Sequence, residues 1–170
     1  MYARLLTLAI AAAAALPIPA KDDSRFELGS TGAATVRASG SEARYFVASD
    51  GRHTISLGAQ QGSGALTLSL PAGSGPTEGR HELSGSVSKG MRAAFVAGTV
   101  EQPVGWFGGE SGWVRVTDVQ AGRVSGEFEI RARGFVRANP DDENQWVTVR
   151  GTFEAKADSA VATVATVDRN

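Results

Sequence analysis

Short stretches of alternating apolar and polar residues recur along most of the chain, and this two-residue period is typical of strands half buried in a sheet. The alternation is clearest in Ala65–Leu70, Val124–Arg137 and Trp146–Ala155. It predicts further strands over Ala34–Ser39, Ala43–Ala48, His53–Leu57, Arg80–Leu83, Ala93–Val100 and Trp113–Val119. We find no amphipathic helix of ordinary length after the first twenty residues.

The segments between these strands carry turn residues. Asp50-Gly51 is a strong hairpin signal, and Pro71–Gly79 is a loop rich in Gly, Pro and Ser. We expect Lys21–Thr31 to be a polar lead-in and Val104–Gly112 to be an apolar turn or a bulged strand. For Ala157–Asn170 two readings stay open, a last edge strand and a flexible tail.

About eight to ten short strands without intervening helices indicate an all-β fold. We favour an antiparallel β-sandwich, because the inward positions are mostly Ala, Val, Gly and Leu, which fill a thin core. The alternative is a closed antiparallel β-barrel of the lipocalin-like kind. The residues from 21 to 156 have the size of a single domain.

One strand pattern occurs twice near the end of this domain. The sequence V-x-G-x-F-E spans Val124–Glu129 and returns at Val149–Glu154. We expect the two copies to pair as an antiparallel hairpin across a loop at Pro140–Gln145. Opposite charges then favour the register that sets Arg131 against Glu154, because like charges placed opposite each other destabilise a sheet.

The first twenty residues have the pattern of a secretory signal peptide. Arg4 precedes the apolar run Leu5–Leu16, and Ala20 offers a small residue before the charged Lys21. The run is too short to cross a membrane of about 30 Å comfortably, so we expect cleavage rather than an anchor. The protein is then exported to the periplasm or beyond the cell, with no stable membrane insertion after cleavage.

The composition of the chain indicates which classes of partner are not expected. The 17 basic and 18 acidic residues nearly cancel, and no block of like charge points to nucleic acid or to an anionic membrane. The chain has no cysteine, so disulfides do not hold the fold. The 21 glycines against six prolines suit many tight turns and bulges.

Two local patterns resemble a loose group of uncharacterised exported bacterial β-sandwich proteins, many of them lipoproteins. One is the strand with Gly112, Val114 and Val116 that leads into the paired V-x-G-x-F strands. The other is the joint Gly75–Leu83, where a proline and a glycine precede a short strand. The resemblance implies the fold and export, and it supplies no catalytic residue. This chain lacks the acylated cysteine of the lipoprotein members.

Candidate reactive residues have plainer explanations. No nucleophile elbow of the G-x-S-x-G type joins a strand to a helix, and we expect His53 and His81 to be exposed turn residues without a metal. The acidic stretch Asn139–Asn144 fits a solvated hairpin loop better than a calcium site. Carboxylates for glycan cleavage are conceivable at three positions, but we expect cross-strand ion pairs there instead. These positions are Glu127, Glu129 and Glu154. We expect no cofactor.

Aromatic residues give the better indication of a site. Alternation places Trp113 and Trp146 on polar faces, and Trp106-Phe107 lie in a glycine-rich stretch nearby. Exposed indoles can stack on sugars or anchor a protein partner. The competing reading is that a loop or the tail covers them. We also expect Arg137 to make a cation–π contact with Trp146.

The sequence therefore predicts an exported, non-enzymatic binding or structural module of the bacterial cell envelope. A glycan or another envelope protein is the expected partner, and Trp106, Phe107, Trp113 and Trp146 form the expected binding surface. Two alternatives stay open. One is a carrier of a small apolar ligand in a β-barrel, and the other is a glycan-acting enzyme with a carboxylate pair.

Overall fold

A computed structural model describes residues 24–58, 63–71, 75–83, 90–99 and 101–158. The expected signal peptide lies outside the described residues, as does nearly all of the segment expected to form an edge strand or a tail. Within the described residues the secondary structure consists of strands joined by turns, and no helix is long and apolar enough to cross a membrane.

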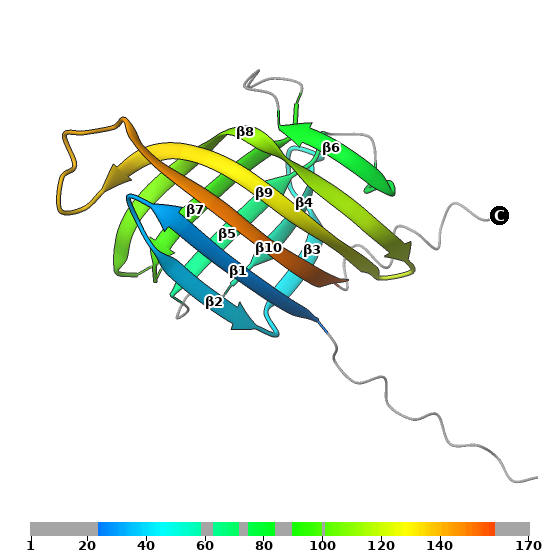
Figure 1. Ribbon diagram of the computed structural model, residues 1–170. Helices are drawn as coiled ribbons and strands as arrows, with labels where there is room; N and C mark the ends of the chain where they lie inside the picture. The colour runs from blue at the N-terminus through cyan, green and yellow to red at the C-terminus, as the bar shows by residue number, and fades with distance from the viewer. Residues whose placement is uncertain (1–23, 59–62, 72–74, 84–89, 100, 159–170) are drawn as a thin grey trace, which may run out of the picture.

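The described part of the chain forms ten strands (Figure 1), which confirms the predicted all-β class. Their bounds are β1 Arg25–Gly32, β2 Val36–Gly40, β3 Ala43–Val47, β4 His53–Leu57, β5 Gly64–Ser69, β6 Gly79–Leu83, β7 Arg92–Gly98, β8 Pro103–Gln120, β9 Arg123–Val136 and β10 Gln145–Ala157. All strand pairs are antiparallel except one, a short parallel contact between β10 and β3.

The strand order brings the two ends of the described chain together. The sheet runs β2-β1-β10-β3-β4-β5-β7-β8-β6, and β9 pairs with both β10 and β8. In Figure 1, β9, β10, β1 and β2 lie side by side in front of β3, β4 and β5, whose direction crosses theirs, and β8 joins β9 to β7. The large antiparallel sheet is therefore established, and the sandwich arrangement stays a prediction.

One element prediction was wrong: the expected polar lead-in contains β1, a full strand between β2 and β10, with Phe26 and Leu28 buried. For Val104–Gly112 the second of the two expected forms, a bulged strand, is the one observed. This segment is the first half of β8, which continues through Val119 as one strand of 18 residues. Two register shifts, one between Gly109 and Ser111 and one between Val116 and Asp118, let this long strand bend.

The buried side chains form one cluster to which nearly all the strands contribute. Ile55, Leu57, Leu66, Leu68 and Ile130 are 0% exposed. In the strands that carry the clearest alternation, β5, β9 and β10, every second side chain points into this cluster, and the intervening ones form an outer face.

The two V-x-G-x-F strands do pair antiparallel, but the predicted register was wrong. Arg150 lies opposite Glu129, and Glu154 lies opposite Ser125. In the observed register Gly126 faces Phe153 and Gly151 faces Phe128, so each aromatic ring covers the glycine of the other copy. The two rings stack with centroids 6.5 Å apart. The observed register therefore seats both rings over glycines on the inner face and also pairs Arg150 with Glu129 on the outer face.

Candidate functional site

The structure separates the four aromatic residues of the predicted surface. Trp106 is 40% exposed and Trp146 is 38% exposed, whereas Trp113 is partly buried. Phe107 is 2% exposed and packs in the core against Phe95, with ring centroids 6.1 Å apart. Strand alternation explains the difference, because neighbouring residues of β8 point to opposite faces. Phe107 therefore does not belong to the exposed surface.

Trp113 lies away from the other two tryptophans. It is seven residues along β8 from Trp106, which corresponds to about 20 Å. Its ring carries the guanidinium of Arg80 at 4.7 Å from the centroid, and its cross-strand neighbours are Glu82 and Glu129. Cation–π contact and charged neighbours account for this indole without a ligand.

Two arginines cover part of Trp146. The guanidinium of Arg131 lies 4.3 Å from the ring centroid and that of Arg133 lies 6.0 Å away. The prediction that Arg137 makes a cation–π contact with Trp146 was wrong, because the observed register places Arg133 directly opposite Trp146. One face of the indole is thus occupied.

Trp106 stands in a different environment. Its cross-strand neighbours on β7 and β9 are Val96 and Phe135, so three apolar side chains lie in line on the outer face. The rings of Trp106 and Phe135 are 5.3 Å apart and tilted by 37°. Val104, two residues before Trp106, is 55% exposed. The result is an apolar platform open to solvent.

Next to this platform, at Gly108, the outer face of the sheet carries no side chain. Gly108 lies between Ala94 of β7 and Arg133 of β9. A Cβ built at Gly108 would have its nearest neighbour, the carbonyl oxygen of Arg133, at 4.0 Å. A side chain would fit here without strain, and glycine weakens a strand interior. Packing therefore does not explain why this position is glycine.

A polar wall borders the bare floor. The bulge after Gly109 leaves Glu110 without a cross-strand partner, and its carboxylate accepts from Arg133 Nε at 3.2 Å and lies 3.0 Å from Arg133 Nη2. Arg133 Nη1 also donates to Asn144 Oδ1 at 3.5 Å. The arginine charge is thus balanced, and its position is fixed from two sides.

These residues enclose a groove of about 570 Å³ on the outer face of β7, β8 and β9. We call it the Trp106 groove. It combines the aromatic platform, the glycine floor and the Arg133–Glu110 wall, and Glu143 and Asn144 of the β9–β10 loop close one side. Such a site suits a ligand with an apolar flat face and polar edges.

The sequence pattern predicts Trp106 and Phe107, which both line this groove, but it does not predict the other members. Phe135, Glu110 and Arg133 reach it only through the β8–β9 register, which no local pattern reveals. One signal was present: Gly108 lies in a strand interior two residues after an exposed tryptophan.

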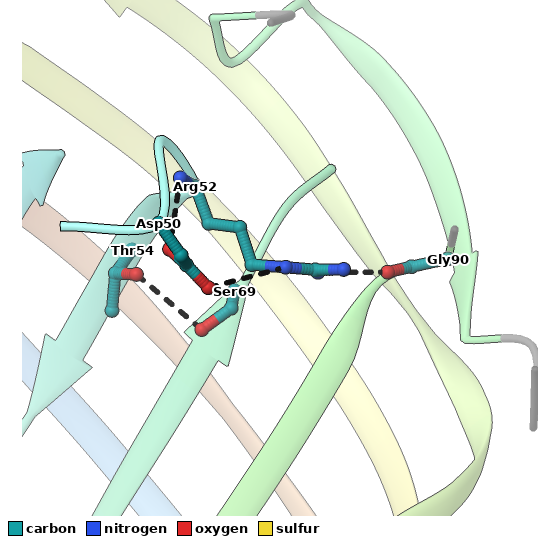
Figure 2. A network of polar contacts seen from close by, with 5 residues as sticks. All are labelled: Asp50, Arg52, Thr54, Ser69 and Gly90. Atoms are coloured by element: carbon teal, nitrogen blue, oxygen red, sulfur yellow. Dashed lines mark hydrogen bonds and ion pairs between the residues drawn. The ribbon is translucent and has the colours of Figure 1, made fainter. Parts of the chain in front are cut away.

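A second polar cluster lies at the turn between β3 and β4 (Figure 2). Arg52 is 7% exposed, and its Nη1 donates to the carbonyl of Gly90 at 3.0 Å. Asp50 accepts from the backbone N–H of Arg52 at 3.1 Å, and the Thr54 and Ser69 hydroxyls meet at 3.3 Å. Among the described residues no basic side chain is hydrogen-bonded to these two hydroxyls. The Arg52–Gly90 hydrogen bond connects the turn to the segment just before β7.

The two histidines lie on the predicted strands β4 and β6, and both are partly buried rather than exposed turn residues. His53 of β4 stacks on Tyr45 of β3, with centroids 5.7 Å apart, and its Nδ1 is hydrogen-bonded to the tyrosine hydroxyl. Burial raises the pKa of Tyr45 and lowers that of His53. His81 Nε2 contacts the carbonyl of Thr77 at 2.8 Å. The described part of the chain holds no cluster of three or more His, Cys, Asp or Glu able to bind a metal.

The three strand carboxylates are each ion-paired, as predicted. Glu129 lies 3.0 Å from Arg150, Glu127 lies 3.7 Å from Arg115, and Glu154 pairs with Arg25. The Asn139–Asn144 stretch is an exposed hairpin loop, in which Asp142 Oδ1 accepts from the N–H of Asn144 at 3.1 Å. Both observations agree with the structural explanations of these acids.

Comparison with protein-family models, with curated proteins and with solved structures finds no match to this chain.

Proposed function

We propose that this protein is an exported, non-enzymatic module of the bacterial cell envelope that binds a glycan in the Trp106 groove. One observation carries the proposal: Gly108 leaves the floor of the groove open beside an exposed indole, although a side chain would fit there. Glycine in a strand interior weakens the strand, and such a glycine is expected where a ligand approaches the backbone closely.

The chemistry of the groove favours a sugar ring. The C–H face of a pyranose can stack on Trp106 and Phe135, while hydroxyls at its edge meet Glu110, Arg133 and Asn144. Because Glu110 already neutralises Arg133, we infer a ring without net charge at this position.

The alternative of an apolar ligand carried inside the fold receives less support. The inward side chains include Phe95, Phe107, Phe128 and Phe153, each no more than 2% exposed. The glycan-acting enzyme also receives less support, because its candidate carboxylates are already engaged by arginines.

Binding of hexasaccharides of glucose, N-acetylglucosamine, mannose and galactose, measured by calorimetry, tests the proposal. A Gly108→Leu change fills the floor and Trp106→Ala removes the platform, so each is expected to weaken binding by about tenfold or more. Trp113→Ala is the matched control on the same strand and is expected to leave affinity unchanged. Equal losses in Trp106→Ala and Trp113→Ala, or no binding to any of the four sugars, would contradict the proposal.

Export rests on the signal-peptide pattern of Met1–Ala20, and it has its own test. Protein recovered from the exported fraction is expected to begin near Lys21 by mass spectrometry. An intact Met1 in the membrane pellet would indicate an anchor instead.

A further inference from the structure

A second groove lies on the outer face of β2, β1 and β10, and its volume is about 390 Å³. Its centre is Gly29 of β1, which pairs with Arg37 of β2 on one side and with Arg150 of β10 on the other. Two arginines thus flank a residue without a side chain. We call this site the Gly29 groove.

Packing does not account for Gly29. A Cβ at this position would meet only the carbonyl oxygen of Val36, at the ordinary contact distance of 3.7 Å. In contrast, a Cβ at Gly151 of the neighbouring strand would lie 2.1 Å from the carbonyl oxygen of Glu27. The open floor at Gly29 is therefore a feature of the groove and not a requirement of the sheet.

The two arginines differ in how many of their guanidinium nitrogens already have a hydrogen-bond or ion-pair partner. Arg37 is exposed and makes no side-chain hydrogen bond or ion pair with any residue that the structure describes. Arg150 uses Nε for Glu129 Oε2 at 3.0 Å, which leaves its two terminal nitrogens able to donate elsewhere. Since neighbouring strands are about 4.8 Å apart, the two Cα atoms lie about 10 Å apart, within reach of one small anion for two flexible arginine side chains.

The next line of side chains across the groove is polar. Glu27 lies opposite Ser39 on one side and Thr152 on the other, so two hydroxyls and one carboxylate border the arginines. The hydroxyls can donate to an anion, whereas Glu27 opposes it. Replacing Glu27 by a neutral residue should therefore tighten anion binding.

We propose that the Gly29 groove binds an oxyanion, a carboxylate, sulfate or phosphate group, between the guanidinium groups of Arg37 and Arg150. Planar guanidinium groups bind such anions through paired hydrogen bonds. The site is separate from the Trp106 groove and does not depend on it. The anion can come from a free inorganic ion or from an acidic sugar.

Titration with inorganic phosphate, sodium sulfate and a glucuronate-containing hexasaccharide, followed by the amide signal of Gly29, tests this site in the folded protein. We expect saturable binding that Arg37→Gln and Arg150→Gln each weaken by about tenfold. Glu27→Gln is expected to tighten binding, and Gly29→Val to weaken it without lowering the melting temperature. Arg115→Gln is the control, because that arginine lies outside the groove.

Each outcome is decisive. Binding of the acidic hexasaccharide alone identifies an acidic sugar as the source, and equal binding of the inorganic ions identifies a free oxyanion. No saturation with any of the three probes, equal losses in Arg37→Gln and Arg115→Gln, or unchanged affinity in Gly29→Val would overturn the site. Gly108→Leu is expected to leave this binding unchanged, so the two grooves can fail independently.

Discussion

Gly151 and Gly108 are both glycines within strands, but a side chain would meet different surroundings at each. A Cβ at Gly151 would lie 2.1 Å from the carbonyl oxygen of Glu27 and 2.8 Å from the ring of Phe128. At Gly108 nothing is nearer than 4.0 Å. The first glycine serves the fold, and we have assigned the second to the groove.

Alanine is expected to lower the stability at Gly151 but not at Gly108. Gly151→Ala should lower the free energy of unfolding by about 1–3 kcal/mol or more, because backbone and ring must move. Gly108→Ala should leave it unchanged or raise it by about 0.4–1 kcal/mol, since alanine reduces the freedom of the unfolded chain. Urea unfolding of the two variants measures the difference. A loss at Gly108 equal to that at Gly151 would show that both glycines are structural.

Arg52 illustrates a charged residue used for structure. Its guanidinium is buried and donates to the Gly90 carbonyl at 3.0 Å, while Asp50, 3.6 Å away, stays largely exposed. Arg52→Met keeps much of the apolar packing but leaves that carbonyl without its donor. We expect a loss of about 1–3 kcal/mol in unfolding free energy. The exposed Arg115, changed in the same way, should cost less than about 0.5 kcal/mol. Similar losses at both positions would contradict the buried role.

At the scale of elements, the β9–β10 hairpin shows which interactions set a register. Surface charge alone suggested Arg131 opposite Glu154, but the observed pairing joins Arg150 to Glu129 and seats each phenylalanine over a glycine. A double-mutant cycle on Glu129 and Arg150 should give a coupling energy of about 0.2–1 kcal/mol. The same cycle on Arg131 and Glu154 should give none. The reverse result would support the charge-selected register.

Local patterns predicted most of the strands because alternation is a property of neighbouring residues. They missed β1, whose sequence has only Phe26 and Leu28 as large apolar side chains and which becomes a strand by pairing with β10 at the far end of the chain. For the same reason, Trp106 and Phe107 are the only lining residues of the Trp106 groove that local patterns predicted. Phe135 and Arg133 reach it through a bulged long-range pairing that no window of sequence contains.

At the scale of the whole molecule, the fold separates two kinds of surface. The inner face carries Phe95, Phe107, Phe128 and Phe153 and holds the strands together. The outer face carries both grooves, three strands apart from Gly29 on β1 to Gly108 on β8. Changes on the outer face can therefore alter binding while the core stays intact.

The Tyr45–His53 pair gives the global stability a pH dependence. The pKa of His53 is lowered by burial from 6.5, so between the folded and unfolded pKa values the unfolded chain binds more protons. The free energy of unfolding should therefore fall as the pH drops below about 6.5. The raised pKa of Tyr45 predicts a second loss of unfolding free energy as the pH rises above 10.0.

Urea midpoints across this pH range, compared with those of His53→Gln, measure the loss at acidic pH, which should shrink in the variant. An identical acid profile in His53→Gln would assign the loss to other groups.

Stacking of a sugar ring on Trp106 can be followed through the three indole N–H signals of ¹⁵N-labelled protein. During titration with the neutral hexasaccharides we expect the Trp106 signal to move and saturate, with a smaller change at Trp146, which faces Arg133 of the same wall. The Trp113 signal, about 20 Å away on the same strand, should stay in place. Movement of the Trp113 signal equal to that of Trp106, or no movement of any indole signal, would show that no sugar ring stacks on Trp106.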